Sequence, residues 1–224
     1  MGNIQISIQY DGFAEKYDEI FLKYNRESII EYFSCFDGNL KGMNVLDIGC
    51  GNGYDLAIFR EMGAITYGVD SSKEMVKIAQ KNNAESIVKV GCFEELPFEE
   101  NSFDFVVSKW AVQTADSIDL VYKEISRVLK PDGKLIFLAC HPMRQFMEKK
   151  GDVKNYFVKE NVESTFFDGQ VTAIEPSHTF NEYLSELFFK NFKLEMFKEG
   201  IDSSIENVNG NIYPGHFIIK AVKK

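Results

Sequence analysis

The 224-residue sequence lacks the features that would place it in several special classes of protein. No stretch approaches the roughly 18 apolar residues that a membrane-spanning helix needs, and the start, MGNIQISIQYDGF, has neither the basic end nor the apolar core of a secretory signal. Repeats, low-complexity segments and flexible linkers are also missing. Cys35, Cys50, Cys92 and Cys140 form no CxxC pair and have no histidine at metal-ligand spacing. We therefore expect a reduced, cytoplasmic protein without a membrane segment or metal site.

Basic charge is also scarce. The sequence has 25 Lys and Arg against 34 Asp and Glu, a net charge of −9. A nucleic-acid binder needs a basic surface to displace counterions, so we expect no nucleic-acid partner. Hydrophobic residues make up 45% and charged residues 26%, which is typical of a soluble globular chain. The length fits a single α/β domain, with or without a small addition.

Short apolar runs alternate with helical patterns along the middle of the chain. They predict five strands, at 43–48, 65–70, 86–90, 103–108 and 134–140. Strands separated by helices predict right-handed βαβ units and a parallel sheet. Two further strands, at 192–197 and 216–222, follow without an intervening helix and should pair antiparallel. The predicted fold is α/β, a doubly wound seven-stranded sheet, mostly parallel with an antiparallel last strand.

One domain is predicted, in four parts. Residues 1–40 form a helical lead-in, residues 41–141 the ligand-binding core, residues 142–180 a small inserted cap, and residues 181–224 a C-terminal helix and strand pair. The cap shows only a weak strand pattern, around 171–174.

Capping residues mark two of the expected helices. Ser71 or Ser72 can begin the helix after the second strand, with Glu74 completing a capping box from Ser71. Thr179 and Glu182 form a second predicted capping box.

A glycine-rich turn follows the first predicted strand, in the sequence VLDIGCGNGY. Ligands of open α/β sheets bind beyond the carboxyl ends of the strands, near this point. Gly49, Gly51 and Gly53 allow the backbone to pass close to a ligand and to turn into a helix. The spacing is GxGxG, and Tyr54 stands where a dinucleotide-binding fold has its third small residue. Asp70 ends the second strand, where a carboxylate can accept hydrogen bonds from both hydroxyls of a ribose.

Four segments in register carry a family resemblance: VLDIGCGNGYDL, YGVDSSKEMVKIAQ, GCFEELPFEENSFDFVVSKWAV and EISRVLKPDGKLIF. They resemble the class I S-adenosylmethionine-dependent methyltransferases, in the small-molecule branch that includes the ubiquinone and menaquinone methyltransferases. The resemblance covers about residues 43 to 140. It implies a Rossmann-like methyltransferase fold, S-adenosyl-L-methionine as cofactor, and a small-molecule methyl acceptor. It also implies a monomer or a homodimer. We expect the acceptor site under residues 1–36 and 141–180, because the parallel sheet leaves only that side open.

The resemblance further implies contacts with the cofactor. The residues that it places around the methionine part are Asp47, Gly49, Cys50, Gly51, Asn52 and Gly53 on the loop, and Ser108, Lys109 and Trp110 after the fourth strand. Those that it places around the adenosine are Asp70, Ser71, Met75, Cys92, Phe93 and Glu94. Tyr17, with Tyr10, is the implied aromatic lid. Cys92 departs from the family, which commonly has an acidic residue there to accept from the adenine amino group.

A catalytic base is needed only if the acceptor carries a proton at the working pH. Two histidines are the predicted substrate contacts or bases. His141 directly follows the fifth strand, and His178 precedes the helix that the Thr179–Glu182 capping box begins. We expect His216, at the start of the last strand, to be structural.

The acceptor and two rival functions stay open. The aromatic residues of the cap indicate a partly apolar acceptor or a packed cap core; they are Phe157, Phe166, Phe167 and Phe180. One rival function is an NAD-dependent oxidoreductase on a related sheet. The other is a non-catalytic S-adenosylmethionine-binding module with a regulatory or assembly role.

Overall fold

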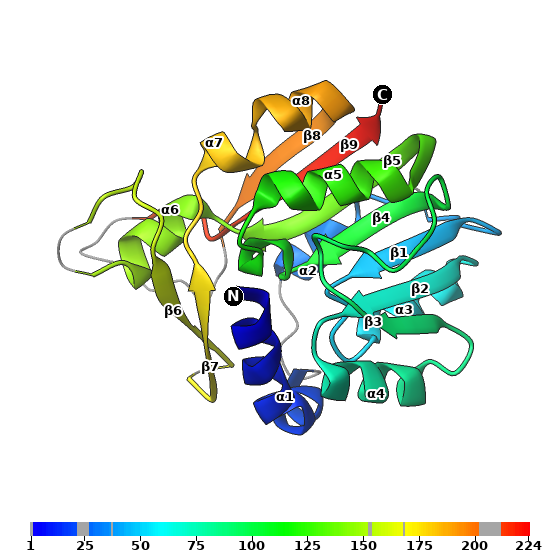
Figure 1. The fold of residues 1–224 in the computed structure, drawn as a ribbon, viewed down its shortest axis with the longest axis horizontal. Helices are drawn as coiled ribbons and strands as arrows, with labels where there is room; N and C mark the ends of the chain where they lie inside the picture. Colours follow the sequence, from blue (N-terminus) through cyan, green and yellow to red (C-terminus); the bar gives the residue numbers. More distant parts are fainter. Residues whose placement is uncertain (1, 22–26, 37, 152–153, 168, 202–211) are drawn as a thin grey trace.

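The chain is built on a seven-stranded sheet, seen in a computed structural model that describes residues 2–21, 27–36, 38–151, 154–167, 169–201 and 212–224 (Figure 1). Its strands are β1 (Asn44–Ile48), β2 (Ile65–Asp70), β3 (Ile87–Val90), β4 (Phe103–Lys109), β5 (Leu129–Cys140), β8 (Phe192–Gly200) and β9 (His216–Lys223). Their order is β3-β2-β1-β4-β5-β9-β8. The strands β1 to β5 pair in parallel, and β9 is antiparallel to both neighbours. The predicted fold class is confirmed.

Helices cover both faces of this sheet. On one face lie α5 (Ile118–Val128), α7 (Phe180–Tyr183) and α8 (Glu186–Asn191), and on the other lie α2 (Glu27–Phe33), α3 (Tyr54–Glu61) and α4 (Lys73–Asn82). The strand β5 shows why a central strand reads as an unbroken apolar run. Its Leu135 and Phe137 face the α5 side, whereas Ile136 and Leu138 face the α2 side, and all four are fully buried.

The predicted cap contains more strand than the sequence indicated. After α6 (Pro142–Arg144) and the short π-helix η2 (Gln145–Lys149), β6 (Asn161–Phe166) pairs antiparallel with β7 (Val171–Pro176). The prediction missed β6 because its inward positions are Val162 and a polar Ser164, which leaves no apolar alternation to detect.

The helical lead-in includes α1 (Gly2–Phe21), which lies between the hairpin β6–β7 and α4 (Figure 1). Of the four aromatic residues named for the cap, Phe166 has a side chain that lies outside the described part of the structure. Over the described parts of the chain, no helix combines the length and apolarity needed to cross a bilayer.

Helix capping corrects one expectation and confirms another. Ser72, and not Ser71, is the N-cap of α4, where its hydroxyl accepts a hydrogen bond from the Met75 amide. The Ser71–Glu74 box does not form, because the Glu74 amide donates to Asp11 of α1 instead. The predicted capping box between Thr179 and Glu182 is present at the start of α7.

Candidate cofactor and acceptor site

The glycine-rich loop joins β1 to α3 at the carboxyl edge of the sheet. Gly49 (φ 73°), Gly51 (φ 52°) and Gly53 (φ 79°) all have left-handed backbone, which favours glycine. A Cβ atom on Gly49 would collide with Ala111 and would lie 3.2 Å from the Phe93 ring. A Cβ on Gly51 would meet no heavy atom within 4 Å. The loop is therefore closely packed at Gly49 and open at Gly51.

Asp70 fastens the end of β2 to this loop. Its Oδ2 accepts a hydrogen bond from the Gly51 amide at 2.9 Å, and its Oδ1 accepts one from the Ser72 amide at 2.9 Å. Burial raises the pKa of Asp70, while the amides of Ser72, Gly51 and Ser71 act to lower it. The carboxylate is thus fixed beside the open position of the loop, with lone pairs left for further donors.

Asp47 places a second carboxylate beneath the loop. It is 2% exposed, and its Oδ1 is buried without a hydrogen-bond partner. Burial, together with the nearby charge of Asp55, raises the pKa of Asp47 well above its usual range, and Lys109 opposes that shift. Lys109 itself forms an ion pair with Asp55 and lies over the Tyr54 ring at 5.4 Å from its centroid. A buried carboxylate oxygen without a partner is suited to bind a cationic group.

The chemistry of these residues matches the groups that S-adenosylmethionine carries. The cofactor carries an ammonium group that suits the buried oxygen of Asp47, and a ribose whose hydroxyls suit Asp70. The space above Gly51 leaves room for a ligand to approach the backbone. The residues present therefore fit the group that the sequence resemblance implies.

Some of the predicted contact residues point their side chains into the core. Cys50 packs with Leu56 and Val76 beneath the loop, and burial raises the pKa of its thiol. Met75 is 1% exposed. Ser108 is fully buried and donates to the Ile48 carbonyl at 2.8 Å, which holds the end of β1 against β4.

The remaining predicted residues of the adenine side lie on the segment after β3. Phe93 packs against Gly49, and Cys92 forms a backbone bridge with Glu95. Cys92 and Glu94 are half-buried.

Helix α1 supplies contacts that the sequence prediction missed. Asp11 accepts hydrogen bonds from the Ser72 hydroxyl at 2.6 Å and from the Glu74 amide at 3.1 Å. Asp18 accepts one from Asn52 Nδ2 at 2.8 Å. Asp11 and Asp18 are about two helical turns apart in the sequence, a spacing that predicts one shared face of a helix. That signal was available, but it is weak without a known partner surface.

The opposite side of α1 contacts the hairpin. Gln9 exchanges hydrogen bonds with the Ile174 backbone, and the Tyr17 ring lies 5.1 Å from that of Phe167. Burial raises the pKa of Tyr10 well above its usual range, with contributions from Tyr17, Glu175 of β7 and Asp70 of β2. Tyr10 therefore lies within electrostatic range of both the glycine-rich loop region and the hairpin.

His141 is 3% exposed, and the structure engages both of its ring nitrogens. Its Nδ1 accepts a hydrogen bond from the Met143 amide at 2.9 Å, and its Nε2 lies 2.7 Å from Glu199 Oε1. The ring is therefore an Nε2–H tautomer that caps α6. Burial lowers the pKa of His141, against the opposing effect of Glu199.

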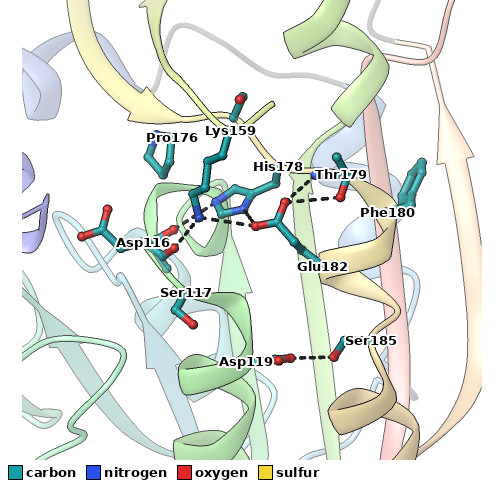
Figure 2. A network of polar contacts seen from close by, with 12 residues as sticks. Asp116, Ser117, Asp119, Lys159, Pro176, His178, Thr179, Phe180, Glu182 and Ser185 are labelled. Atoms are coloured by element: carbon teal, nitrogen blue, oxygen red, sulfur yellow. Dashed lines mark hydrogen bonds and ion pairs between the residues drawn. The ribbon is translucent and has the colours of Figure 1, made fainter. Parts of the chain in front are cut away.

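His178 lies at the centre of the polar network drawn in Figure 2. Its Nε2 donates to the Ala115 carbonyl at 3.0 Å, and its Nδ1 lies 3.1 Å from Glu182 Oε1. Lys159 contacts the Asp116 carbonyl and the same carboxylate. The network ties the end of the cap to the segment that follows β4.

Each ring nitrogen of His141 and of His178 thus has a partner within the protein. Either ring could act as a base only after one of these contacts is broken. Their catalytic role stays a prediction.

Comparisons with known proteins identify relatives of this chain. A family model described as a methyltransferase domain matches residues 46–137. An uncharacterized protein of Methanocaldococcus jannaschii is 32% identical over 198 residues, which cover 85% of this chain and 86% of that protein. Demethylmenaquinone methyltransferase of Staphylococcus aureus is 30% identical over 60% of this chain, and the match spans 59% of that relative's length. The crystal structure of an S-adenosylmethionine-dependent methyltransferase from Mesorhizobium loti shares the fold, with a TM-score of 0.69 at 18% identity over 86% of this chain and 96% of that one.

Proposed function

Because this chain belongs to the class I S-adenosylmethionine-dependent methyltransferases, we propose that it transfers the methyl group to a small-molecule acceptor by in-line displacement. The chain is an enzyme that uses S-adenosylmethionine as its cofactor. The observation that carries the proposal is the unit formed by Asp70 and the loop, in which the Gly51 amide donates to the carboxylate at the carboxyl edge of the sheet. The oxidoreductase and binding-module alternatives are not favoured, since the matched family is a methyltransferase family.

In this proposal the chain's own residues bind and orient the cofactor. Asp70 accepts hydrogen bonds from the ribose, and Asp47 pairs with the ammonium group of the methionine part. Gly49, Gly51 and Gly53 let the backbone lie close to it. When bound, the cofactor supplies an electrophilic methyl carbon on a sulfonium. In this proposal, Cys92, Phe93 and Glu94 after β3 and Trp110 after β4 complete the walls.

The acceptor side is proposed to consist of α1 as a lid and residues 142–180 as a cap. Tyr10 and Tyr17 lie on the lid, and Phe167 and Val171 of the cap pack against Tyr17 and Phe13. Such packing excludes water, which strengthens the electrostatic interactions in a closed site. The name of the S. aureus relative, with its small-molecule quinone substrate, supports a small organic acceptor.

Titration calorimetry with S-adenosylhomocysteine, using NADH as the control ligand, tests this proposal. We expect one-to-one binding of S-adenosylhomocysteine and none of NADH. A panel of amine, phenol, hydroxy-acid and carboxylate acceptors then follows, with release of S-adenosylhomocysteine as the signal. Binding of NADH alone would overturn the proposal, and cofactor binding with no acceptor in any class would favour the non-catalytic module.

A further inference from the structure

The third histidine, His216, lies at the same edge of the sheet as the candidate site. It is the first residue of β9, where it pairs with Cys140, the last residue of β5, and with Gly200, the last residue of β8. Because β9 runs antiparallel to β5, its first residue lies at the carboxyl end of the parallel strands. The His216 residue is 1% exposed.

The two ring nitrogens of His216 differ in a way that those of His141 and His178 do not. Its Nε2 lies 3.1 Å from Glu31 Oε2, while Lys198 Nζ lies 3.2 Å from the other oxygen of the same carboxylate. Its Nδ1 is buried and has no hydrogen-bond partner. A neutral imidazole that donates from Nε2 carries its lone pair on Nδ1. His216 is therefore a buried ring with an oriented and unused proton acceptor.

The backbone around the ring is shaped to hold it. A Cβ atom on Gly200 would collide with the imidazole, so a glycine is required there for space and not for conformation. The Trp110 ring lies 6.1 Å from the imidazole, edge to face. Trp110 has a φ of 57°, which is strained for a bulky residue, and such strain concentrates at functional sites.

Trp110 also connects the histidine to the glycine-rich loop. It directly follows β4, and the next residue, Ala111, occupies the space where Gly49 would otherwise carry a Cβ. One dipeptide thus touches His216 on one side and the loop on the other. Trp110 and Ala111 therefore link the His216 ring to the proposed cofactor loop. Among the described residues, the rings that contact His141 and His178 make no such link to the loop.

We propose that His216 is the catalytic base for an acceptor that carries an N–H or O–H group, with Glu31 as the residue that positions it. This rests on the proposed function. The bond between the acceptor atom and its hydrogen breaks, and the proton moves to Nδ1. The electron pair stays on the acceptor atom and would form its new bond to the methyl carbon, while the bond from that carbon to the sulfonium sulfur would break, its electrons staying on the sulfur of the departing S-adenosylhomocysteine. The ring becomes an imidazolium, whose charge is balanced by the Glu31 carboxylate at Nε2. The sequence expectation of a purely structural His216 is replaced in this proposal.

Two variants test the assignment. His216→Gln keeps an amide nitrogen that can donate to Glu31 but removes the acceptor at Nδ1. With an acceptor found in the panel, we expect kcat/KM to fall by about 100-fold to 10,000-fold, the usual contribution of a general base, with unchanged affinity for S-adenosylhomocysteine. Glu31→Gln should lower kcat with little change in KM, because a neutral amide no longer balances the charge of the imidazolium that forms during turnover. Unchanged turnover in His216→Gln, or an unchanged kcat in Glu31→Gln, would overturn the proposal.

A measurement that needs no acceptor accompanies these variants. Long-range proton–nitrogen NMR of the ¹⁵N-histidine-labelled protein at neutral pH should show His216 protonated at Nε2 and unprotonated at Nδ1. A His216 ring that carries a proton on Nδ1 would contradict the base role. Calorimetry with S-adenosylhomocysteine on the same sample keeps the two ideas apart, since the proposed function fails if this ligand does not bind, whatever the state of His216.

Discussion

Asn52 of the glycine-rich loop donates a hydrogen bond to Asp18 of α1, with 2.8 Å between Nδ2 and Oδ1. Asn52 is 6% exposed, so the bond is largely shielded from solvent. Asp11, on the same helix, holds the start of α4 through Ser72 and Glu74. The helix α1 is therefore attached by two carboxylates to the two segments that flank the candidate cofactor site. These hydrogen bonds hold α1 against the loop and against the start of α4.

A double-mutant cycle on this pair tests that role. Asp18→Ala and Asn52→Ala should each speed the dissociation of S-adenosylhomocysteine, because a hydrogen bond to a charged group contributes about 1.5–3 kcal/mol. The double variant should be little worse than the more damaged single variant, since both remove the same bond. Dissociation rates from surface plasmon resonance give the comparison. Fully additive effects would show that the two side chains act separately.

Gly49 and Gly51 form a matched pair, because both have positive φ but only Gly49 is crowded. We expect Gly49→Ala to lower the free energy of unfolding much more than Gly51→Ala, since a methyl group at Gly49 meets Ala111 and Phe93. Gly51→Ala should cost only about 1–2 kcal/mol of backbone strain, yet weaken S-adenosylhomocysteine binding by filling the open space. Urea unfolding and calorimetry measure both effects. Equal destabilisation by the two substitutions would contradict the packing at Gly49.

The pH dependence of stability tests the network around His178. Burial acts to raise the pKa of Glu182, but hydrogen bonds from His178 and Thr179 lower it from 4.5 to about 2. A carboxyl group whose pKa is lower in the folded protein than in the unfolded chain stabilises the fold above pH 4.5. That stabilisation is lost as the pH falls toward 2. The side chain is 33% exposed, so solvent screening reduces the size of the effect.

Urea unfolding at pH 7 and at pH 3 gives the free energy of unfolding of the wild type and of Glu182→Gln. The wild type should have the larger value at pH 7, and the difference between the two proteins should shrink at pH 3. A difference that is constant across this range would show that Glu182 does not titrate in the network.

The sequence predicted the core of the fold because each signal there was local. The five parallel strands of the core are short apolar runs, and Gly49, Gly51 and Gly53 announce a tight turn at the end of the first one. The capping box of Thr179 and Glu182 is also readable from spacing alone. The lack of a helix between the last two strands predicted that they pair antiparallel, and the family resemblance added the cofactor.

The missed features depend on contacts between distant segments. Asp11 accepts the hydrogen bond from the Glu74 amide that the Ser71 hydroxyl was expected to accept, because α1 folds back across the site. His141 and His178 lie near the predicted site, but their ring nitrogens are engaged by Glu199, Met143, Glu182 and Ala115. No spacing rule reports which nitrogen of a histidine remains unpaired, so sequence reasoning ranked the three histidines by position alone.

The most direct test of the account compares calorimetric titrations of the wild type and Asp70→Ala with S-adenosylhomocysteine. Asp70 is the residue through which the end of β2, the Gly51 amide and the α4 start meet. We expect one-to-one binding by the wild type and a loss of about 2–3 kcal/mol of binding free energy in the variant, because hydrogen bonds to a charged group are lost. At about 1.4 kcal/mol for each factor of ten, that is roughly a 30-fold to 150-fold weaker affinity. Equal affinity in a folded Asp70→Ala protein would contradict the placement of the cofactor at this site.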